Sequence, residues 1–292
     1  MTTLNDVIER TKRHLHSGET RDERDKLDGA VASADTTLQL VYGRDGAQSG
    51  VVLALGLEEL YVWEKTDSTV VVSRGQNGST AEAHSDQAII YVKPKFSSFS
   101  VLKSVNEELD ALSADGLYKV STVALTYVPG TDAYNLTGVT DLIDIISVEY
   151  KVNDGSSRWA SLPVTQYRLR RDMATADFAS GMALTINGYV ENGAMRVTYK
   201  APYSPLSALA NDVETVSGLH SQAHDILSIG AALRLVAVSE VSRNFLDQSE
   251  TRRATEVPAG ARGALIRNLA SLRVTRLEAE KSRLYAKRPV MM

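Results

Sequence analysis

The apolar residues of this chain follow two different spacings in alternating regions, and this alternation is the strongest constraint on its fold. Residues 36–72 and 117–201 contain short runs of β-branched and aromatic residues separated by Gly, Asp and Ser, a pattern typical of strands and turns. Elsewhere apolar residues recur three or four positions apart, which predicts helices. The predicted helices cover residues 4–15, 97–112, 226–245 and 262–285.

The order of these regions predicts an α+β protein: an N-terminal helix, two β-rich blocks separated by a helix, and a C-terminal helical region. Thr3, with Asp6 three positions on, predicts the first helix start, and Ser97 or Ser98 predicts the second. Gly18 and Gly116 are the predicted ends. Residues 19–28 are nearly all charged and predict a short solvated helix or a loop.

A chain of 292 residues is long enough for about two domains. We expect residues 1–116 to hold the N-terminal helix, a small β-domain and the second helix. Residues 117–203 predict a small sandwich or barrel, with a hairpin turn at Asn153-Asp154-Gly155 and with Trp159 and Tyr167 as core or interface anchors. Residues 204–292 then form a helical region with a basic tail.

The net charge of −4 conceals an uneven distribution. From Arg252 onward there are ten basic and three acidic residues, a net charge of +7, whereas the rest of the chain has a net charge of −11. This distribution excludes a uniformly basic nucleic-acid binder. It indicates an acidic body with an arginine-rich C-terminal end.

The chain contains no cysteine, which excludes disulfides, thiolate zinc sites, iron–sulfur clusters and cysteine nucleophiles. It also contains no phosphate-binding loop, nucleophile elbow, dinucleotide fingerprint or His-Glu-x-x-His motif. We therefore predict no enzyme, no catalytic residue, no cofactor and no metal.

Two residue patterns were weighed against that prediction. His220 and His224 have the spacing of a two-histidine metal site, but a third ligand such as Asp225 would point elsewhere, so we interpret them as the polar start of a helix. Carboxylates also lie close together at Asp141 and Asp144 and at Glu107-Glu108. We interpret them as solubilising surface groups.

The C-terminal helix mixes leucines with basic residues, and the leucines need a partner surface. Three interpretations stay open: docking on an acidic protein surface, a solvated helix, and contact with nucleic-acid phosphates. We favour protein docking because the planar arginine fork pairs well with carboxylates. The candidate docking residues are Leu265, Arg267, Leu269, Leu272, Arg273, Arg276, Lys281, Arg283, Leu284, Tyr285, Lys287 and Arg288.

A motif after the fourth strand-like run resembles structural proteins of tailed bacteriophages. The family pattern is Val-x-Arg-Gly-x-x-Gly-Thr-x-Ala-x-x-His. Arg74, Gly75, Gly78, Thr80 and His84 carry the resemblance here, and Ser79 lies between Gly78 and Thr80. Independently of the family, the two glycines predict a turn with positive φ. A structural hydrogen bond to that turn is the expected role of His84.

The second half of the chain is similar to head–tail connector or adaptor proteins of siphophages. The similar segments are residues 148–159, Tyr199-Lys200-Ala201-Pro202-Tyr203 and Ile229-Gly230-Ala231-Ala232-Leu233-Arg234-Leu235. The resemblance implies a homo-oligomeric, dodecameric ring that joins the capsid portal to a downstream neck or tail protein. It implies DNA passing through the lumen without sequence recognition, and a place at the capsid–tail junction of the virion after synthesis in the host cytoplasm, with no membrane partner.

Other functions remain open. The chain could instead be another phage tail or baseplate structural or adhesion module, although its helical C-terminal region is unlike an adhesion tip. A virion-associated cell-wall hydrolase, from a different class, would need a carboxylate pair or a histidine site. A DNA-binding assembly factor would show salt-dependent binding to duplex DNA.

Overall fold

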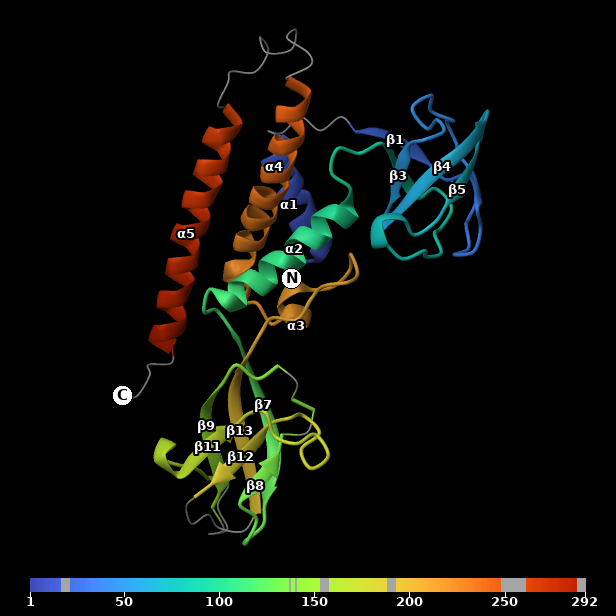
Figure 1. Cartoon of the computed structure of the whole chain (residues 1–292). Coiled ribbons are helices and arrows are strands. Elements are labelled where there is room, and N and C mark those ends of the chain that lie inside the picture. Colours follow the sequence, from blue (N-terminus) through green and yellow to red (C-terminus); the bar gives the residue numbers. More distant parts are fainter. Residues whose placement is uncertain are drawn as a thin grey trace. The chain divides into compact units, whose positions relative to one another are not determined.

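The computed structural model confirms the predicted α+β class (Figure 1). It describes residues 1–16, 22–136, 138–139, 141–152, 158–187, 193–247 and 261–287, with 239–247, 261, 262 and 287 described by their backbone alone. The chain divides into two compact units. Residues 1–111 and 204–292 form the first unit, and residues 112–203 form the second. The N-terminal and C-terminal regions, which the sequence analysis separates, therefore belong to one unit.

The helices are α1 (Leu4–His16), α2 (Ser98–Ala114), α3 (Val213–Ser217), α4 (His224–Asp247) and α5 (Ala261–Lys287). The strands of the first unit are β1 (Glu23–Lys26), β2 (Thr37–Gln39), β3 (Val52–Leu55), β4 (Glu58–Thr66), β5 (Thr69–Ser73) and β6 (Ile89–Val92). The strands of the second unit are β7 (Lys119–Tyr127), β8 (Ala133–Asn135), β9 (Asp144–Lys151), β10 (Trp159–Ser161), β11 (Tyr167–Arg170), β12 (Ala183–Ile186) and β13 (Gly193–Ala201).

The six strands of the first unit form one antiparallel sheet in the order β1-β6-β3-β4-β5-β2. Its two edge strands meet, because Leu27 bridges Leu40 and the amide of Asp28 donates to the carbonyl of Gln39 over 2.8 Å. The sheet therefore curls on itself as a small barrel (Figure 1). Its interior is filled with buried aliphatic side chains, among them Leu53 and Leu60.

Strand β1 lies where the sequence predicted a solvated helix or a loop, and that prediction was wrong. Glu23 and Arg24 are exposed, whereas Asp25 is almost completely buried. The carboxylate of Asp25 accepts hydrogen bonds from the backbone amides of Lys26, Tyr42 and Arg44. A charged residue can occupy the interior side of a strand when backbone donors satisfy it, and residue type alone does not reveal those donors.

Helices α1, α2, α4 and α5 lie within two residues of their predicted ranges, whereas the short helix α3 was not predicted. Thr3 and Asp6 form a reciprocal capping box at α1, and Ser97 caps α2 by accepting from the amide of Ser100. Gly116, just after α2, has a φ of 92°. The predicted end at Gly18 lies outside the described residues. Helix α4 packs against both α1 and α5. None of the described helices has the length and apolar character needed to cross a membrane.

The second unit is a sandwich, one of the two architectures predicted for it. A four-stranded sheet, β10-β9-β13-β7, and a three-stranded sheet, β11-β12-β8, share one core that includes Val148, Leu184 and Val197. Tyr167 packs against this core. Trp159 instead lies at the surface, with the Arg196 guanidinium 4.8 Å from its ring centroid. The predicted turn at Asn153-Asp154-Gly155 lies outside the described residues.

We predict that Asp25→Ala lowers the free energy of unfolding by about 2–4 kcal/mol, because it leaves buried amide donors without their acceptor. Asp25→Asn keeps one acceptor oxygen and should cost less. Urea denaturation of the full chain measures both values. A loss within about 0.5 kcal/mol for Asp25→Ala, the range typical of surface substitutions, would contradict this role of Asp25.

Candidate functional site

The motif that carries the phage resemblance converges on one buried carboxylate, that of Glu58 at the start of β4. Arg74 donates to it from Nε over 2.6 Å and from Nη2 over 2.7 Å, and His84 Nε2 lies 2.8 Å from it. The amides of Gly75 and Glu82 also point at it, each over 3.3 Å. The Glu58 side chain is completely buried.

Arg74 also donates to three backbone carbonyls, those of Ala32, Asp35 and Glu82. It therefore joins two loops to the end of β5. The sequence led us to expect a hydrogen bond between His84 and the turn. Instead, His84 and the turn residue Gly75 both contact the carboxylate of Glu58. The side chains of Arg74 and His84 thus connect separate segments of the barrel through Glu58.

Burial alone would raise the pKa of Glu58, but the hydrogen bonds from Arg74 and His84 outweigh it and lower that pKa. Glu58 is thus ionised at neutral pH. An ionised carboxylate with several charge-assisted donors stabilises the fold as long as every donor stays in place.

The next residue, Glu59, connects the barrel to α2. Its carboxylate accepts hydrogen bonds from Ser97, the cap of α2, and from Asn77 in the turn after β5. Its backbone amide donates to Ser79 Oγ over 2.9 Å. Ser79, which lies between Gly78 and Thr80 of the motif, therefore has a structural role in this chain.

Helix α5 holds most of the candidate docking residues, and part of its apolar face packs on its own chain. Leu269 is buried against Ile229 and Ala232 of α4, and Leu265 lies at the edge of this cluster. Leu277 is also buried and Leu284 is half-buried. The partner surface that these leucines need is thus supplied, at least in part, by α4.

Two of the candidate arginines on α5 form ion pairs inside the first unit. Arg273 Nε lies 2.5 Å from Oε1 of Glu108, a buried residue of α2, and Arg234 of α4 reaches the other oxygen over 3.2 Å. Arg276 forms a two-pronged pair with Asp225, with Nε–Oδ2 and Nη2–Oδ1 distances of 2.6 and 3.1 Å. These arginines fasten α5 to the acidic residues of α2 and α4.

Glu108 fits between the helices because Gly230 lies opposite it on α4. A Cβ atom at Gly230 would lie 2.1 Å from Glu108 Cδ, far inside van der Waals contact. Burial raises the pKa of Glu108, although Arg273 and Arg234 act in the opposite direction. The carboxylate is therefore expensive to bury, and its position depends on both arginines.

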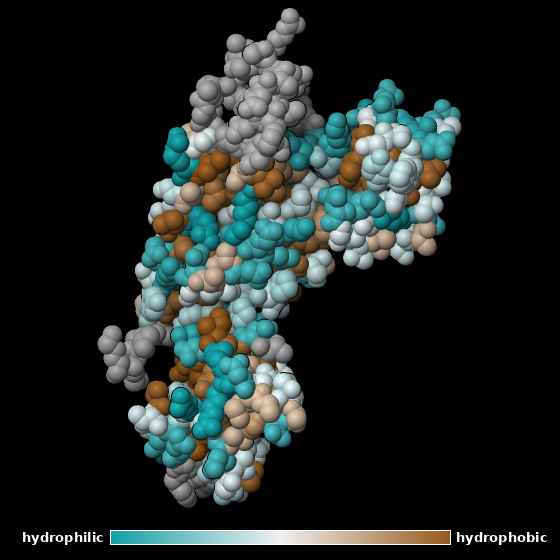
Figure 2. Space-filling model, viewed as in Figure 1, coloured by the Kyte–Doolittle hydropathy of each residue, from teal (hydrophilic) through white to brown (hydrophobic). Residues whose placement is uncertain are grey.

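The other candidate docking residues point away from α4 or pair within α5. Lys281 pairs with Glu278, and Arg283 pairs with Glu280. Arg267, Leu272 and Tyr285 are exposed, the last two by 44% and 61%. The side chain of Lys287 and the whole of Arg288 lie outside the described residues. Figure 2 shows brown, apolar side chains between teal ones along the visible face of α5.

The two histidines weighed as metal ligands do separate jobs. His224 is buried at the start of α4 with Nε2 3.0 Å from the carbonyl of Leu219, while His220 accepts from the amide of Gln222. Asp225, the possible third ligand, is engaged by Arg276. Within the part of the chain that the structure describes, no group of three or more His, Cys, Asp or Glu residues could hold a metal.

The carboxylate pairs also have neighbours. Asp144 lies 3.2 Å from Lys200 on the surface of the sandwich, and Glu107 lies 3.9 Å from Arg234. Glu107 is more than half exposed, as we expected of a solubilising group. Glu108 is not solubilising, so that interpretation was wrong for it: the residue is buried because Gly230 leaves room and two arginines reach it.

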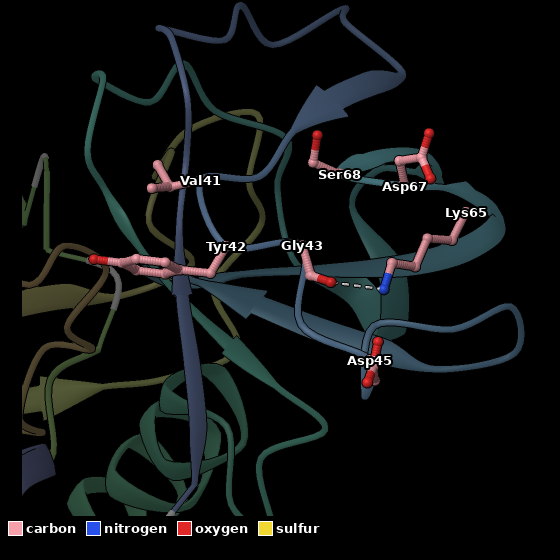
Figure 3. Close-up of a pocket in the computed structure, with 7 residues that line it drawn as sticks. All are labelled: Val41, Tyr42, Gly43, Asp45, Lys65, Asp67 and Ser68. Atoms are coloured by element: carbon pink, nitrogen blue, oxygen red, sulfur yellow. Dashed lines mark hydrogen bonds between the residues drawn. The ribbon is translucent and has the colours of Figure 1, made fainter.

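The barrel also carries an open cleft of about 520 Å³ (Figure 3). Its walls are Val41, Tyr42, Gly43, Asp45, Lys65, Asp67 and Ser68. The Lys65 ammonium, which is the cleft's cation, donates to the carbonyls of Gly43 and Arg44 over 2.9 and 2.7 Å. It therefore holds the loop after β2 in place with two of its three donors.

Sequence reasoning did not single out Glu58 or Asp25, and it classed Glu108 as a surface residue. No local pattern marked them: Asp25 lies among charged residues, and Glu58 and Glu108 each lie next to another glutamate. The partners of Glu58 and Glu108 lie 16 to 165 positions away.

Comparison with known proteins adds no relative: the chain matches no family model, and no curated protein is significantly similar to it. The site therefore has to be interpreted from its own geometry.

We predict that the stability provided by Glu58 is lost in acid. Because its native pKa lies below the ordinary 4.5, the ionised form stabilises the fold above that pH, and the contribution disappears as pH falls through the lowered native pKa. The difference in unfolding free energy between wild type and Glu58→Gln should be about 3–5 kcal/mol at neutral pH and should shrink below about pH 4.5. Urea titrations between about pH 3 and pH 7 measure it. Glu82→Gln, at an exposed carboxylate nearby, is the matched control and should show little difference at any pH.

A second prediction concerns the space beside Glu108. Gly230→Ala should lower the unfolding free energy by about 1–3 kcal/mol, because the added methyl displaces a buried carboxylate from its arginines. Gly263→Ala is the control, since its Cβ would meet only the tip of Arg267 at 3.7 Å. Alanine should stabilise the helix there by up to about 1 kcal/mol. Equal effects of the two substitutions on the calorimetric midpoint would refute the role assigned to Gly230.

Proposed function

We propose that the protein is a structural virion protein of a tailed bacteriophage, a head-to-tail adaptor that joins the capsid portal to the tail as a ring around a DNA channel. The observation that carries the proposal is the convergence of Arg74, Gly75 and His84 on Glu58. The residues that produce the family resemblance stabilise a small barrel, and such a use suits a protein whose task is assembly.

The charge distribution supports the same role. The body is acidic, and an acidic lumen repels the DNA backbone, so DNA would slide through without being held. The basic end of the chain would then face an acidic surface of the portal, where complementary charge steers association. This role requires neither catalysis nor a cofactor.

The docking surface in this proposal is smaller than the set of residues named from the sequence. Arg273, Arg276 and Leu269 already contact α2 or α4, so their loss would first damage the fold. The outward residues Arg267, Leu272 and Tyr285 are exposed and remain suitable for a partner. We propose that these three residues lead the contact with the portal.

The test uses the purified full chain and DNA-filled capsids that carry the portal but lack this protein. Arg267→Glu/Leu272→Ser should reduce joining at least about tenfold, because it reverses a charge and removes an apolar contact at the interface. Electron microscopy of negatively stained particles counts the capsids with an added ring at the neck. The calorimetric midpoint of the variant should stay within about 2 °C of wild type, as for surface substitutions.

Arg267→Lys/Leu272→Met preserves charge and apolar character and serves as the matched control. It should join capsids as wild type does. If wild-type protein adds no ring to portal-bearing capsids, the adaptor function itself is wrong. If Arg267→Glu/Leu272→Ser joins capsids as well as Arg267→Lys/Leu272→Met does, the adaptor function stands but α5 is not the docking element.

A further inference from the structure

The sandwich of the second unit has four strand edges, and they differ sharply. Strands β8 and β10 are three residues long, and β11 is four residues long with arginines at two of its positions. Strand β7 is nine residues long, and among the described strands it pairs only with β13 (Figure 1). An edge strand presents a row of unpaired amides and carbonyls that can accept another strand.

Strand β7 lacks the edge protections that a strand can carry in its own sequence and register. Its sequence, KVSTVALTY, contains no proline and has one charged residue, Lys119, at its first position. Its register with β13 continues over nine residue pairs with no bulge. Short length, charge, proline and bulges are the usual protections against edge-to-edge pairing. The barrel of the first unit solves the same problem by closing on itself.

The core below β7 is also incompletely covered. Val123, Leu125 and Tyr127 face the sandwich core, yet each stays partly exposed. Their neighbours on β13, Met195 and Val197, are completely buried. A further strand beside β7 would cover the partly exposed side chains and satisfy the backbone groups along the edge.

We propose that β7 is a strand-pairing interface, and that its partner is β7 of a second copy of this chain. The two strands would run antiparallel about Val123 and join two four-stranded sheets into one sheet of eight strands. Main-chain hydrogen bonds would provide the affinity, as in other cases of strand addition.

Three features favour a second copy of β7 as the occupant. The first is length, because the other edges that a second copy offers are only three or four residues long. The second is the orientation of the side chains. Pairing about Val123 places odd-numbered, core-facing residues opposite one another and even-numbered residues opposite one another. The apolar faces of both strands therefore stay on the core side. The third is charge. Lys119 would lie opposite Tyr127 of the partner subunit, so no like charges meet.

This pairing is isologous and by itself gives a two-fold dimer. A ring needs head-to-tail contacts instead, so the inference does not rest on the adaptor function, and either can fail without the other.

The first test places charge on the outward side of the edge. Residue 122 would lie opposite residue 124 of the second copy, and both side chains are exposed. Thr122→Glu/Ala124→Glu sets carboxylates against each other in the dimer, while within one chain position 124 faces Arg196 and tolerates a carboxylate. Thr122→Lys/Ala124→Glu is the matched control, since it sets opposite charges against each other.

Sedimentation equilibrium of the full chain at several concentrations measures the dimer dissociation constant. We expect wild type to dimerise, the double glutamate variant to weaken the dimer about tenfold or more, and the Lys/Glu variant to retain it. A monomeric wild type would overturn the proposal in favour of a strand from a different protein. Equal association of all three proteins would overturn it in favour of another surface.

The second test uses the absence of cysteine from the chain. Val123→Cys places one thiol at the two-fold axis, where the two thiols would be in reach of a disulfide. In the same pairing Thr126→Cys would lie about 20 Å from its copy and serves as the control. Mild copper oxidation should crosslink the first variant and not the second on a non-reducing gel. Equal crosslinking of both, or none of Val123→Cys, would overturn the pairing even if the charge variants misfold.

Discussion

Glu108 lies on α2 with its carboxylate against the backbone of Gly230, and Arg234 and Arg273 reach it from α4 and α5. The three helices of this region depend on that one group. A buried carboxylate is tolerable only while its cationic partners stay in place, so α5 cannot leave α4 without removing one of the two arginines that compensate Glu108. Among the described side chains, the apolar cluster that the two helices share has three buried members, Ile229, Ala232 and Leu269. The ion pairs of Arg273 and Arg276 add to this contact.

The barrel uses the same device in a different place. Glu58 collects Arg74, His84 and two backbone amides, and Glu59 ties the barrel to the cap of α2 through Ser97. In each case a single acidic residue connects segments far apart in the chain. This pattern changes the meaning of the charge split. Part of the basic C-terminal charge is matched by acidic residues of the same unit, through Arg273–Glu108 and Arg276–Asp225, so the charge offered to any partner is smaller than +7.

The two β-rich regions treat their edges in opposite ways. The first sheet joins its outer strands through Leu27 and Leu40, whereas in the second unit β7, nine residues long, has one neighbour among the described strands. A closed sheet has no edge at which another chain can pair. An open edge promotes association with other chains unless a partner covers it. The open edge of β7 and the partly exposed core residues on that strand are therefore the features of this unit that best indicate a partner.

The sequence by itself determined the class, the helices and most strands, because spacing of apolar residues and caps such as Thr3 and Ser97 act locally. It also located the sandwich and the motif around Arg74. Only the tertiary structure decided that residues 23–26 form a strand, that both ends of the chain share one unit, and that α5 pairs its arginines internally. The strand depends on Asp25, whose carboxylate accepts from amides 17 and 19 positions away, and the pairing of Arg273 depends on Glu108, 165 positions away. Burial and charge compensation are properties of the folded chain, and no local pattern encodes them.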